Sequence, residues 1–157
     1  MQLAARAGLR VVAASSSNAR NGEFLRELGA HEVVEYSGLD GVKDRFDTII
    51  DTVGGVTLAR CWGYVKDGGS LISVDSSSFN FVEEHRKQGV ARDGGKALFF
   101  IIEGSSRAFR VLAELVDRGL LKSFVSEKYP IERVQEAYDY ANGRYLEGER
   151  SFLLCEC

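Results

Sequence analysis

Short apolar runs alternate along the chain with segments that have the spacing of amphipathic helices. Each run is bounded by Gly, Asp or Ser, which is typical of buried strands. The runs cover residues 9–14, 32–36, 48–51, 70–74 and 97–102. Strands that alternate with helices in this way predict crossover connections and a parallel sheet covered on both faces. The expected fold class is therefore α/β, with a doubly wound sheet.

Glycines predict where the helices between these strands end, because a left-handed glycine commonly follows the last turn of a helix. The helical segments and their closing glycines are 24–28 with Gly29, 109–116 with Gly119, and 131–141 with Gly143. The first residues, before Gly8, have the composition of the back half of a further helix. The polar stretch 76–96 predicts a solvated face of helix and loop.

Composition and charge narrow the class of ligand. The 157 residues are 45% apolar, which is enough for one sizeable core. The formal net charge is -3, so the chain lacks the excess of Lys and Arg that a nucleic-acid or anionic membrane surface requires. No apolar run approaches the roughly 20 residues of a membrane-spanning helix. We expect a small-molecule ligand, no nucleic acid and no membrane.

The cysteines indicate a reducing compartment. The chain has an odd number of cysteines, and they are scattered: Cys61, Cys155 and Cys157. This pattern argues against a disulfide framework and favours the cytoplasm. Cys155 and Cys157 form a C-x-C pair, but His31 and His85 are far away in sequence. We therefore expect no metal site.

A run of hydroxyls follows the first predicted strand. In doubly wound nucleotide-binding sheets, an acidic residue at this point accepts a hydrogen bond from the ribose 2'-hydroxyl of NAD, whereas hydroxyls and an Arg suit the 2'-phosphate of NADP. The acid is absent here, and Ser15, Ser16 and Ser17 are followed by Arg20. The alternative is that Ser17 or Asn18 caps the next helix and that Arg20 is only solvated.

Three further strand ends carry candidate ligand contacts. Tyr36 ends the second predicted strand, where it could pack against an adenosine or could be a half-buried edge aromatic. Val53 and Gly54 follow the third strand, where glycine allows the backbone to approach a ligand closely, although a plain strand-to-helix turn has the same pattern. Asp75 and Ser76 follow the fourth strand, and we expect them at the same carboxyl edge of the sheet, where such folds bind ligands.

In order, these pieces resemble the medium-chain dehydrogenase/reductase superfamily, and within it the zinc-free quinone oxidoreductase-like branch. The segments that carry the resemblance are "ARNGEFLRELGAHEVVEY" (19–36), "FDTIIDTVGG" (46–55), "VKDGGSLISV" (65–74), "ALFFII" (97–102) and the stretch 112–148. The resemblance implies a Rossmann-like fold and NADPH as cofactor. It also implies hydride transfer to quinones or other α,β-unsaturated carbonyls.

The resemblance also implies roles for individual residues. Those expected to bind the cofactor are Ser15, Ser16, Arg20 and Tyr36 at the 2'-phosphate end, Val53 and Gly54 along the adenosine and ribose, Asp75 and Ser76 after the next strand, and Phe100 and Ile101 near the nicotinamide. No catalytic residue is assigned, because the family's substrate-polarising groups lie mostly on an upstream domain. Arg150 stands where the family usually has a lysine.

The chain departs from the family at its beginning. It starts inside the helix that follows the family's first Rossmann strand, so that strand, its glycine-rich loop and the substrate domain are expected to be missing. Losing that strand would leave buried backbone groups unpaired at the centre of the sheet. We expect a partial Rossmann domain over 1–121 and an extension of the substrate domain over 122–157.

Two other functions remain open. One is a non-catalytic remnant or a module that dimerises through the strand 97–102. A methyltransferase that uses S-adenosylmethionine would have a similar strand order, but it would need a glycine-rich first loop and an acid at the end of the second strand, and neither is present.

Overall fold

The computed structural model describes residues 1–101, 103–125, 127–146 and 151–156. It forms two compact units, the first comprising Met1–Ile102 with Arg150–Cys157 and the second Glu103–Glu149. The sequence suggested a boundary after residue 121, whereas the contacts divide the chain after residue 102. The contacts place the boundary closer to the amino terminus because the described residues 103–125 and 127–146 add no strand to the sheet.

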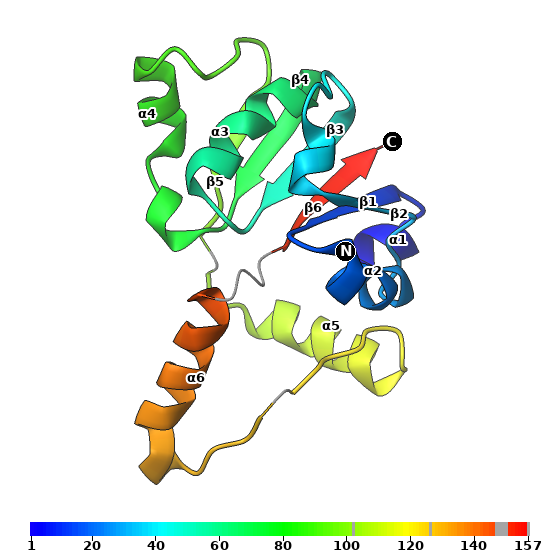
Figure 1. The fold of residues 1–157 in the computed structure, drawn as a ribbon. Coiled ribbons are helices and arrows are strands. Elements are labelled where there is room, and N and C mark those ends of the chain that lie inside the picture. The colour runs from blue at the N-terminus through cyan, green and yellow to red at the C-terminus, as the bar shows by residue number, and fades with distance from the viewer. Residues whose placement is uncertain (102, 126, 147–150, 157) are drawn as a thin grey trace. The chain divides into compact units, whose positions relative to one another are not determined.

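The first unit is built on one six-stranded sheet (Figure 1). Its strands are β1 (Arg10–Ser15), β2 (Glu32–Glu35), β3 (Phe46–Asp51), β4 (Val65–Ser73), β5 (Lys96–Phe99) and β6 (Ser151–Glu156). Its helices are α1 (Gln2–Arg6), α2 (Asn18–Glu27), α3 (Gly55–Tyr64) and α4 (Phe81–Lys87), with short 3-10 turns η1 (Tyr36–Leu39) and η2 (Ser76–Ser78). The strand order is β2-β1-β6-β3-β4-β5.

Five of the six strands run in the same direction. β1 pairs in parallel with β2, and β4 pairs in parallel with both β3 and β5. β1 and β3 are each antiparallel to β6, so they are parallel to one another. The predicted α/β class with a doubly wound parallel sheet is confirmed.

The centre of the sheet is occupied by β6, the red strand between the blue β1 and the cyan β3 in Figure 1. Six residues of β6 are in register with β1, from Ser151 opposite Ser15 to Glu156 opposite Arg10, and three are in register with β3. The expectation that β1 and β3 would lack a partner between them is therefore wrong. The physical reason is that a strand of either direction can satisfy backbone donors and acceptors.

Helices cover both faces of the sheet, as the buried apolar runs predicted. Alternate residues of β1 point to opposite faces. Val12 and Ala14 belong to a cluster with Leu58, Trp62 and Phe81 from α3 and α4. Ala13 belongs to a second cluster with Leu25 of α2, Ala30 and Val33. This two-sided burial explains why β1 is apolar at every position from Val11 to Ala14.

Two of the three predicted helix ends are confirmed. Gly29 and Gly119 have φ of 100° and 65°, and they follow α2 and α5 (Ser106–Asp117). The prediction for Gly143 was wrong, because α6 (Val134–Leu146) continues through it. A glycine inside a helix costs only about 1 kcal/mol, which the rest of a 13-residue helix can offset.

The second unit contains α5, a 3-10 turn η3 (Ile131–Arg133) and α6. Ser105 caps α5, since its side chain accepts a hydrogen bond from the backbone N–H of Ala108 at 3.2 Å. Within the part of the chain that the structure describes, no helix is long and apolar enough to cross a bilayer.

Candidate functional site

The residues predicted to bind a ligand all lie at one edge of the sheet. Because the five parallel strands share a direction, their carboxyl ends meet at that edge, where open α/β sheets bind ligands. Ser15 ends β1, and the other predicted residues follow the strands in this way: Ser16 and Arg20 after β1, Tyr36 after β2, Val53 and Gly54 after β3, Asp75 and Ser76 after β4, and Phe100 and Ile101 after β5.

Ser15 shapes the turn between β1 and α2. Its side chain is fully buried, and its Oγ donates to the carbonyl of Ser17 at 3.1 Å. The same Oγ accepts hydrogen bonds at 3.0 Å from the backbone N–H of Ser17 and from Nδ2 of Asn21. A ligand could reach this hydroxyl only by breaking one of these bonds. Its role as a direct contact stays a prediction.

The first turn of α2 is capped from two sides. Ser17 is the N-cap, and its Oγ accepts from the backbone N–H of Arg20 at 3.4 Å. This part of the alternative reading is confirmed. Arg20 itself is exposed, and its guanidinium has no partner among the described residues.

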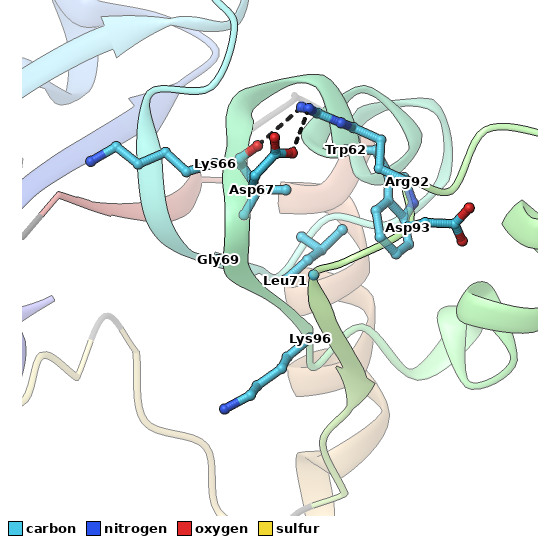
Figure 2. A pocket seen from close by; sticks show the side chains of 10 residues that line it. Trp62, Lys66, Asp67, Gly69, Leu71, Arg92, Asp93 and Lys96 are labelled. Atoms are coloured by element: carbon cyan, nitrogen blue, oxygen red, sulfur yellow. Dashed lines mark hydrogen bonds and ion pairs between the residues drawn. The ribbon is translucent and has the colours of Figure 1, made fainter.

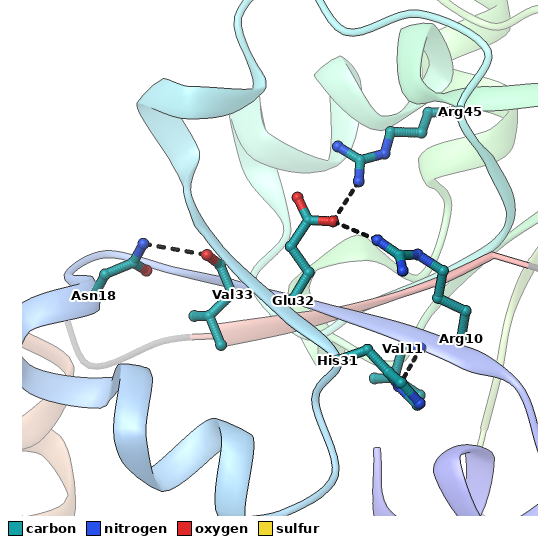
Figure 3. A network of polar contacts seen from close by, with 7 residues as sticks. All are labelled: Arg10, Val11, Asn18, His31, Glu32, Val33 and Arg45. Atoms are coloured by element: carbon teal, nitrogen blue, oxygen red, sulfur yellow. Dashed lines mark hydrogen bonds and ion pairs between the residues drawn. The ribbon is translucent and has the colours of Figure 1, made fainter.

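The second cap is Glu35, which the sequence reading missed. Its Oε1 accepts from the backbone N–H of Asn18 at 2.8 Å. Asn18 also donates from Nδ2 to the carbonyl of Val33 at 3.2 Å, which ties the start of α2 to β2 (Figure 3). The available signal was an acidic residue directly before Tyr36, at the end of a strand adjacent to β1.

A buried carboxylate organises the turn between β3 and α3. Asp51 is fully buried, and it accepts hydrogen bonds from the backbone N–H groups of Val53 at 3.1 Å and Gly54 at 3.1–3.2 Å. It also accepts from Ser73 Oγ at 2.8 Å. Sequence reasoning treated Asp51 only as the end of a strand. Its charge raises the pKa of the neighbouring Cys61 thiol, which burial already raises more strongly.

Gly54 lies against the loop that follows β4. It has φ 73° and ψ -164°, a conformation that is nearly restricted to glycine. A Cβ on Gly54 would stand 2.2 Å from Asp75 Oδ2 and 2.7 Å from Ser78 Oγ. Asp75 Oδ2 is held by hydrogen bonds from the hydroxyls of Ser77 and Ser78, the latter at 2.9 Å. The close backbone approach expected of Gly54 is thus made to the chain's own Asp75.

The remaining predicted residues are Tyr36, Phe100 and Ile101. Tyr36 lines a hollow of about 20 Å³ with Leu39, Thr57, Arg60 and Tyr64, which is room for about one water molecule. Phe100 donates its backbone N–H to the carbonyl of Ser73 at 2.9 Å, which fixes the chain just beyond β5. The side chains of Phe100 and Ile101 are 52% and 68% exposed.

A second small hollow lies at the opposite edge, where β4 and β5 begin (Figure 2). Arg92 borders it and forms ion pairs with Asp44 and, at 2.8 Å from Nη2, with Asp67. Arg92 also donates to the carbonyl of Val65 at 3.3 Å. The guanidinium of Arg92 therefore has its partners within the chain. These contacts indicate a structural role for Arg92, which connects the segment between β2 and β3 to β4.

Metal-ligating side chains of the described residues do not gather at either edge. The described residues contain no cluster of three or more His, Cys, Asp or Glu side chains arranged to hold a metal ion. The side chains of the C-x-C pair, Cys155 and Cys157, and of Arg150 lie outside the described residues.

Comparison with known proteins identifies the family. The sequence pattern of the family described as "Zinc-binding dehydrogenase" matches residues 28–148. A probable zinc-binding oxidoreductase, mitochondrial, from Arthroderma benhamiae is 32% identical over 82% of this chain and 40% of its own length. The mouse NAD(P)H oxidoreductase RTN4IP1, mitochondrial, is 29% identical over 83% of this chain and 38% of its own length.

The fold has counterparts among solved structures. The quinone oxidoreductase from Coxiella burnetii matches with a TM-score of 0.78 at 24% identity, over 96% of this chain and 46% of that one. The chain thus spans about two fifths of the length of the relatives named above. It belongs to the zinc-binding dehydrogenase family, as a quinone oxidoreductase-like member of the medium-chain dehydrogenase/reductase superfamily.

Proposed function

We propose that this chain supplies the cofactor-binding part of an NADPH-dependent oxidoreductase that reduces quinones or other α,β-unsaturated carbonyls. The observation that carries the proposal is the convergence of five parallel strand ends, with their polar and glycine-containing turns, at one edge of the sheet. Family membership supports a nicotinamide cofactor, since one relative is named as an NAD(P)H oxidoreductase. A small-molecule substrate follows from the same membership.

The residues at this edge fit the adenosine end of a dinucleotide. Arg20 is exposed on the first turn of α2 and has a planar, always charged group that suits a 2'-phosphate. Ser16 precedes it, and Tyr36 follows the adjacent strand at the same edge. The turn at Val53 and Gly54 is held in place by Asp51, so its backbone is already ordered before a ligand arrives.

The centre of the edge does not fit the cofactor pyrophosphate in the usual way. That group normally rests on the N-terminus of a helix that follows a central parallel strand. Here β6 is antiparallel and has its first residue, Ser151, at this edge opposite Ser15. The described residues thus supply contacts for the adenosine end of the cofactor.

The bound cofactor would supply the hydride, and this chain would orient it. Phe100 and Ile101 are exposed and apolar just beyond β5, which suits contact with the flat face of a nicotinamide ring. Localisation in the cytoplasm stays a prediction, and both relatives named above are described as mitochondrial.

Titration of the purified full chain with NADPH and with NADH, followed by nicotinamide fluorescence, tests the proposal. We expect saturable binding of both. Arg20→Ala should weaken NADPH binding about tenfold or more and leave NADH binding nearly unchanged, because a charge-assisted contact to the phosphate is lost. Arg26→Ala, on the last turn of the same helix, is the matched control. Absence of saturable binding up to millimolar cofactor would overturn the proposal.

A second candidate function is self-association without catalysis. β5 is an edge strand, and Leu98 within it is 44% exposed, next to the exposed Phe100 and Ile101. Such an edge can pair with a second copy. Sedimentation velocity from micromolar to hundreds of micromolar should then show a dimer that Leu98→Lys weakens, and a monomer throughout would exclude this function.

A further inference from the structure

We infer that Glu35 is a specificity-determining residue that opposes Arg20 and reduces the preference for a cofactor with a 2'-phosphate. This inference rests on the proposed function, because it concerns which form of the nicotinamide cofactor the same edge selects. It adds a residue that the sequence reading did not consider.

The position of Glu35 is fixed by contacts from two elements. It is the last residue of β2, at the carboxyl edge, and its Oε1 lies 2.8 Å from the backbone nitrogen of Asn18. Asn18 is the first residue of α2 and is itself tied to β2 through the carbonyl of Val33. The carboxylate is therefore held at the amino end of α2.

Arg20 stands on the same turn of that helix. Two residues of an α-helix advance by about 3 Å, so the backbone of Arg20 is close to the atom that Glu35 holds. The backbone N–H of Arg20 is taken by Ser17 Oγ, and that of Asn18 by Glu35. A phosphate that approaches the amino end of α2 would thus meet the Glu35 carboxylate, where open N–H donors would otherwise favour an anion.

The charge of Glu35 is not neutralised within the described part of the chain. Glu32, three residues earlier on β2, forms ion pairs with Arg10 at 2.9 Å and with Arg45 at 2.6 Å (Figure 3). Glu35 forms no ion pair with any described residue. Like charges within about one Debye length, roughly 8–10 Å at ordinary salt, repel, so Glu35 should disfavour a dianionic phosphate more than a neutral hydroxyl.

The same carboxylate suits the other cofactor. In this kind of sheet, an acid at the end of the strand that corresponds to β1 accepts a hydrogen bond from the ribose 2'-hydroxyl of NADH. Glu35 lies on the strand adjacent to β1, whose own end carries serines in place of an acid. We therefore expect the chain to bind both cofactors, with Arg20 favouring NADPH and Glu35 favouring NADH.

The substitution Glu35→Gln tests this inference, because glutamine keeps the acceptor for Asn18 and removes the charge. Dissociation constants of the full chain for NADPH and NADH, measured by nicotinamide fluorescence at low salt, should show NADPH binding about threefold tighter or more. NADH binding should stay equal or weaken. Raising the salt concentration should shrink the NADPH effect, which loss of a merely structural contact would not produce.

Two further variants separate charge from structure. Glu27→Gln changes the net charge equally at the far end of α2 and should leave the ratio of the two dissociation constants as in the wild type. Glu35→Asp keeps the charge and should preserve the ratio. Glu35→Ser removes the charge as Glu35→Gln does, and it gives a second measurement of the charge effect if Glu35→Gln fails to fold. Circular dichroism reports the folding of each variant.

The outcomes distinguish the two proposals. An unchanged ratio in a folded Glu35→Gln variant that binds both cofactors overturns the role of Glu35 and leaves the proposed function standing. A shift of the ratio in Glu35→Asp as large as that in Glu35→Gln also overturns it. Absence of binding of either cofactor to the wild type overturns the proposed function, and the role of Glu35 falls with it.

Discussion

Ser73 Oγ donates a hydrogen bond of 2.8 Å to Asp51 Oδ2, and both side chains are fully buried at the carboxyl ends of neighbouring parallel strands. The same carboxylate accepts from the backbone of Val53 and Gly54. One buried charge therefore fixes the end of β3, the end of β4 and the turn between β3 and α3.

Asp51→Asn should destabilise the first unit. An asparagine can present only one oxygen, so at least one of the donors now facing Asp51 would meet an amide NH2 group and lose its partner. We expect a loss of about 2–3 kcal/mol in the free energy of unfolding, since hydrogen bonds to charged groups are worth about 1.5–3 kcal/mol each. Urea unfolding followed by circular dichroism measures it. Ser73→Ala is the control and should cost less, about 1–2 kcal/mol, because it removes a single donor. Equal stability of Asp51→Asn and the wild type would contradict this account.

Gly54→Ala should be more damaging than Gly68→Ala. Both glycines have φ near 74°, where an alanine is strained, and Gly54 also has ψ -164°, in a region nearly restricted to glycine. A Cβ at Gly68 meets nothing within 4 Å, whereas at Gly54 it would stand 2.2 Å from Asp75 Oδ2. We expect thermal unfolding of Gly54→Ala at a clearly lower temperature, together with weaker cofactor binding. Similar midpoints for the two variants would mean that the Gly54 and Asp75 loops are not in contact.

Cys61 should be inert towards alkylating reagents in the folded protein. Burial raises the pKa of its thiol well above the usual value, and the charge of Asp51 raises it further. Because only the thiolate is nucleophilic, iodoacetamide at pH 8 should leave Cys61 unmodified until urea unfolds the chain. Mass spectrometry of the Cys61 peptide reads this out. Labelling at the same rate with and without urea would contradict the burial of Cys61.

Most strands of the sheet could be predicted because each carries its own local signal. The runs 9–14, 32–36 and 48–51 correspond closely to β1, β2 and β3. β4 begins five residues earlier than expected. Gly68 and Gly69 lie inside this strand, where the register with β3 is irregular.

The place of β6 could not be predicted in this way. A short apolar segment near the chain end indicates a strand, but nothing local specifies a partner more than a hundred residues earlier. Asp51 and Glu35 were missed for a related reason. Their importance depends on which backbone N–H groups lie opposite them, and that is decided only when the turns are formed.

The antiparallel register of β6 predicts a specific cross-link. Cys155 stands opposite Val11 in the backbone register of β1 and β6, and directly opposed residues of an antiparallel pair have Cα atoms about 4.5–5.5 Å apart, a separation that a disulfide can span. In a Cys157→Ser background, Val11→Cys should form a disulfide with Cys155 under mild oxidation, as read by mass spectrometry without reductant. Val12→Cys, which stands opposite Leu154, is the control and should not cross-link to Cys155. A cross-link in the control and none in Val11→Cys would place β6 in another register.

The central claim, that the carboxyl edge of the parallel strands binds a nicotinamide cofactor, is tested most directly by a residue-resolved NMR titration of the ¹⁵N-labelled full chain with NADPH. The account predicts saturable shifts of the backbone amides after the strand ends, at Ser16, Arg20, Tyr36, Gly54 and Ser76. Amides at the opposite edge, near Arg10 and Lys66, should stay unchanged. Shifts concentrated at that opposite edge, or none at millimolar cofactor, would contradict it.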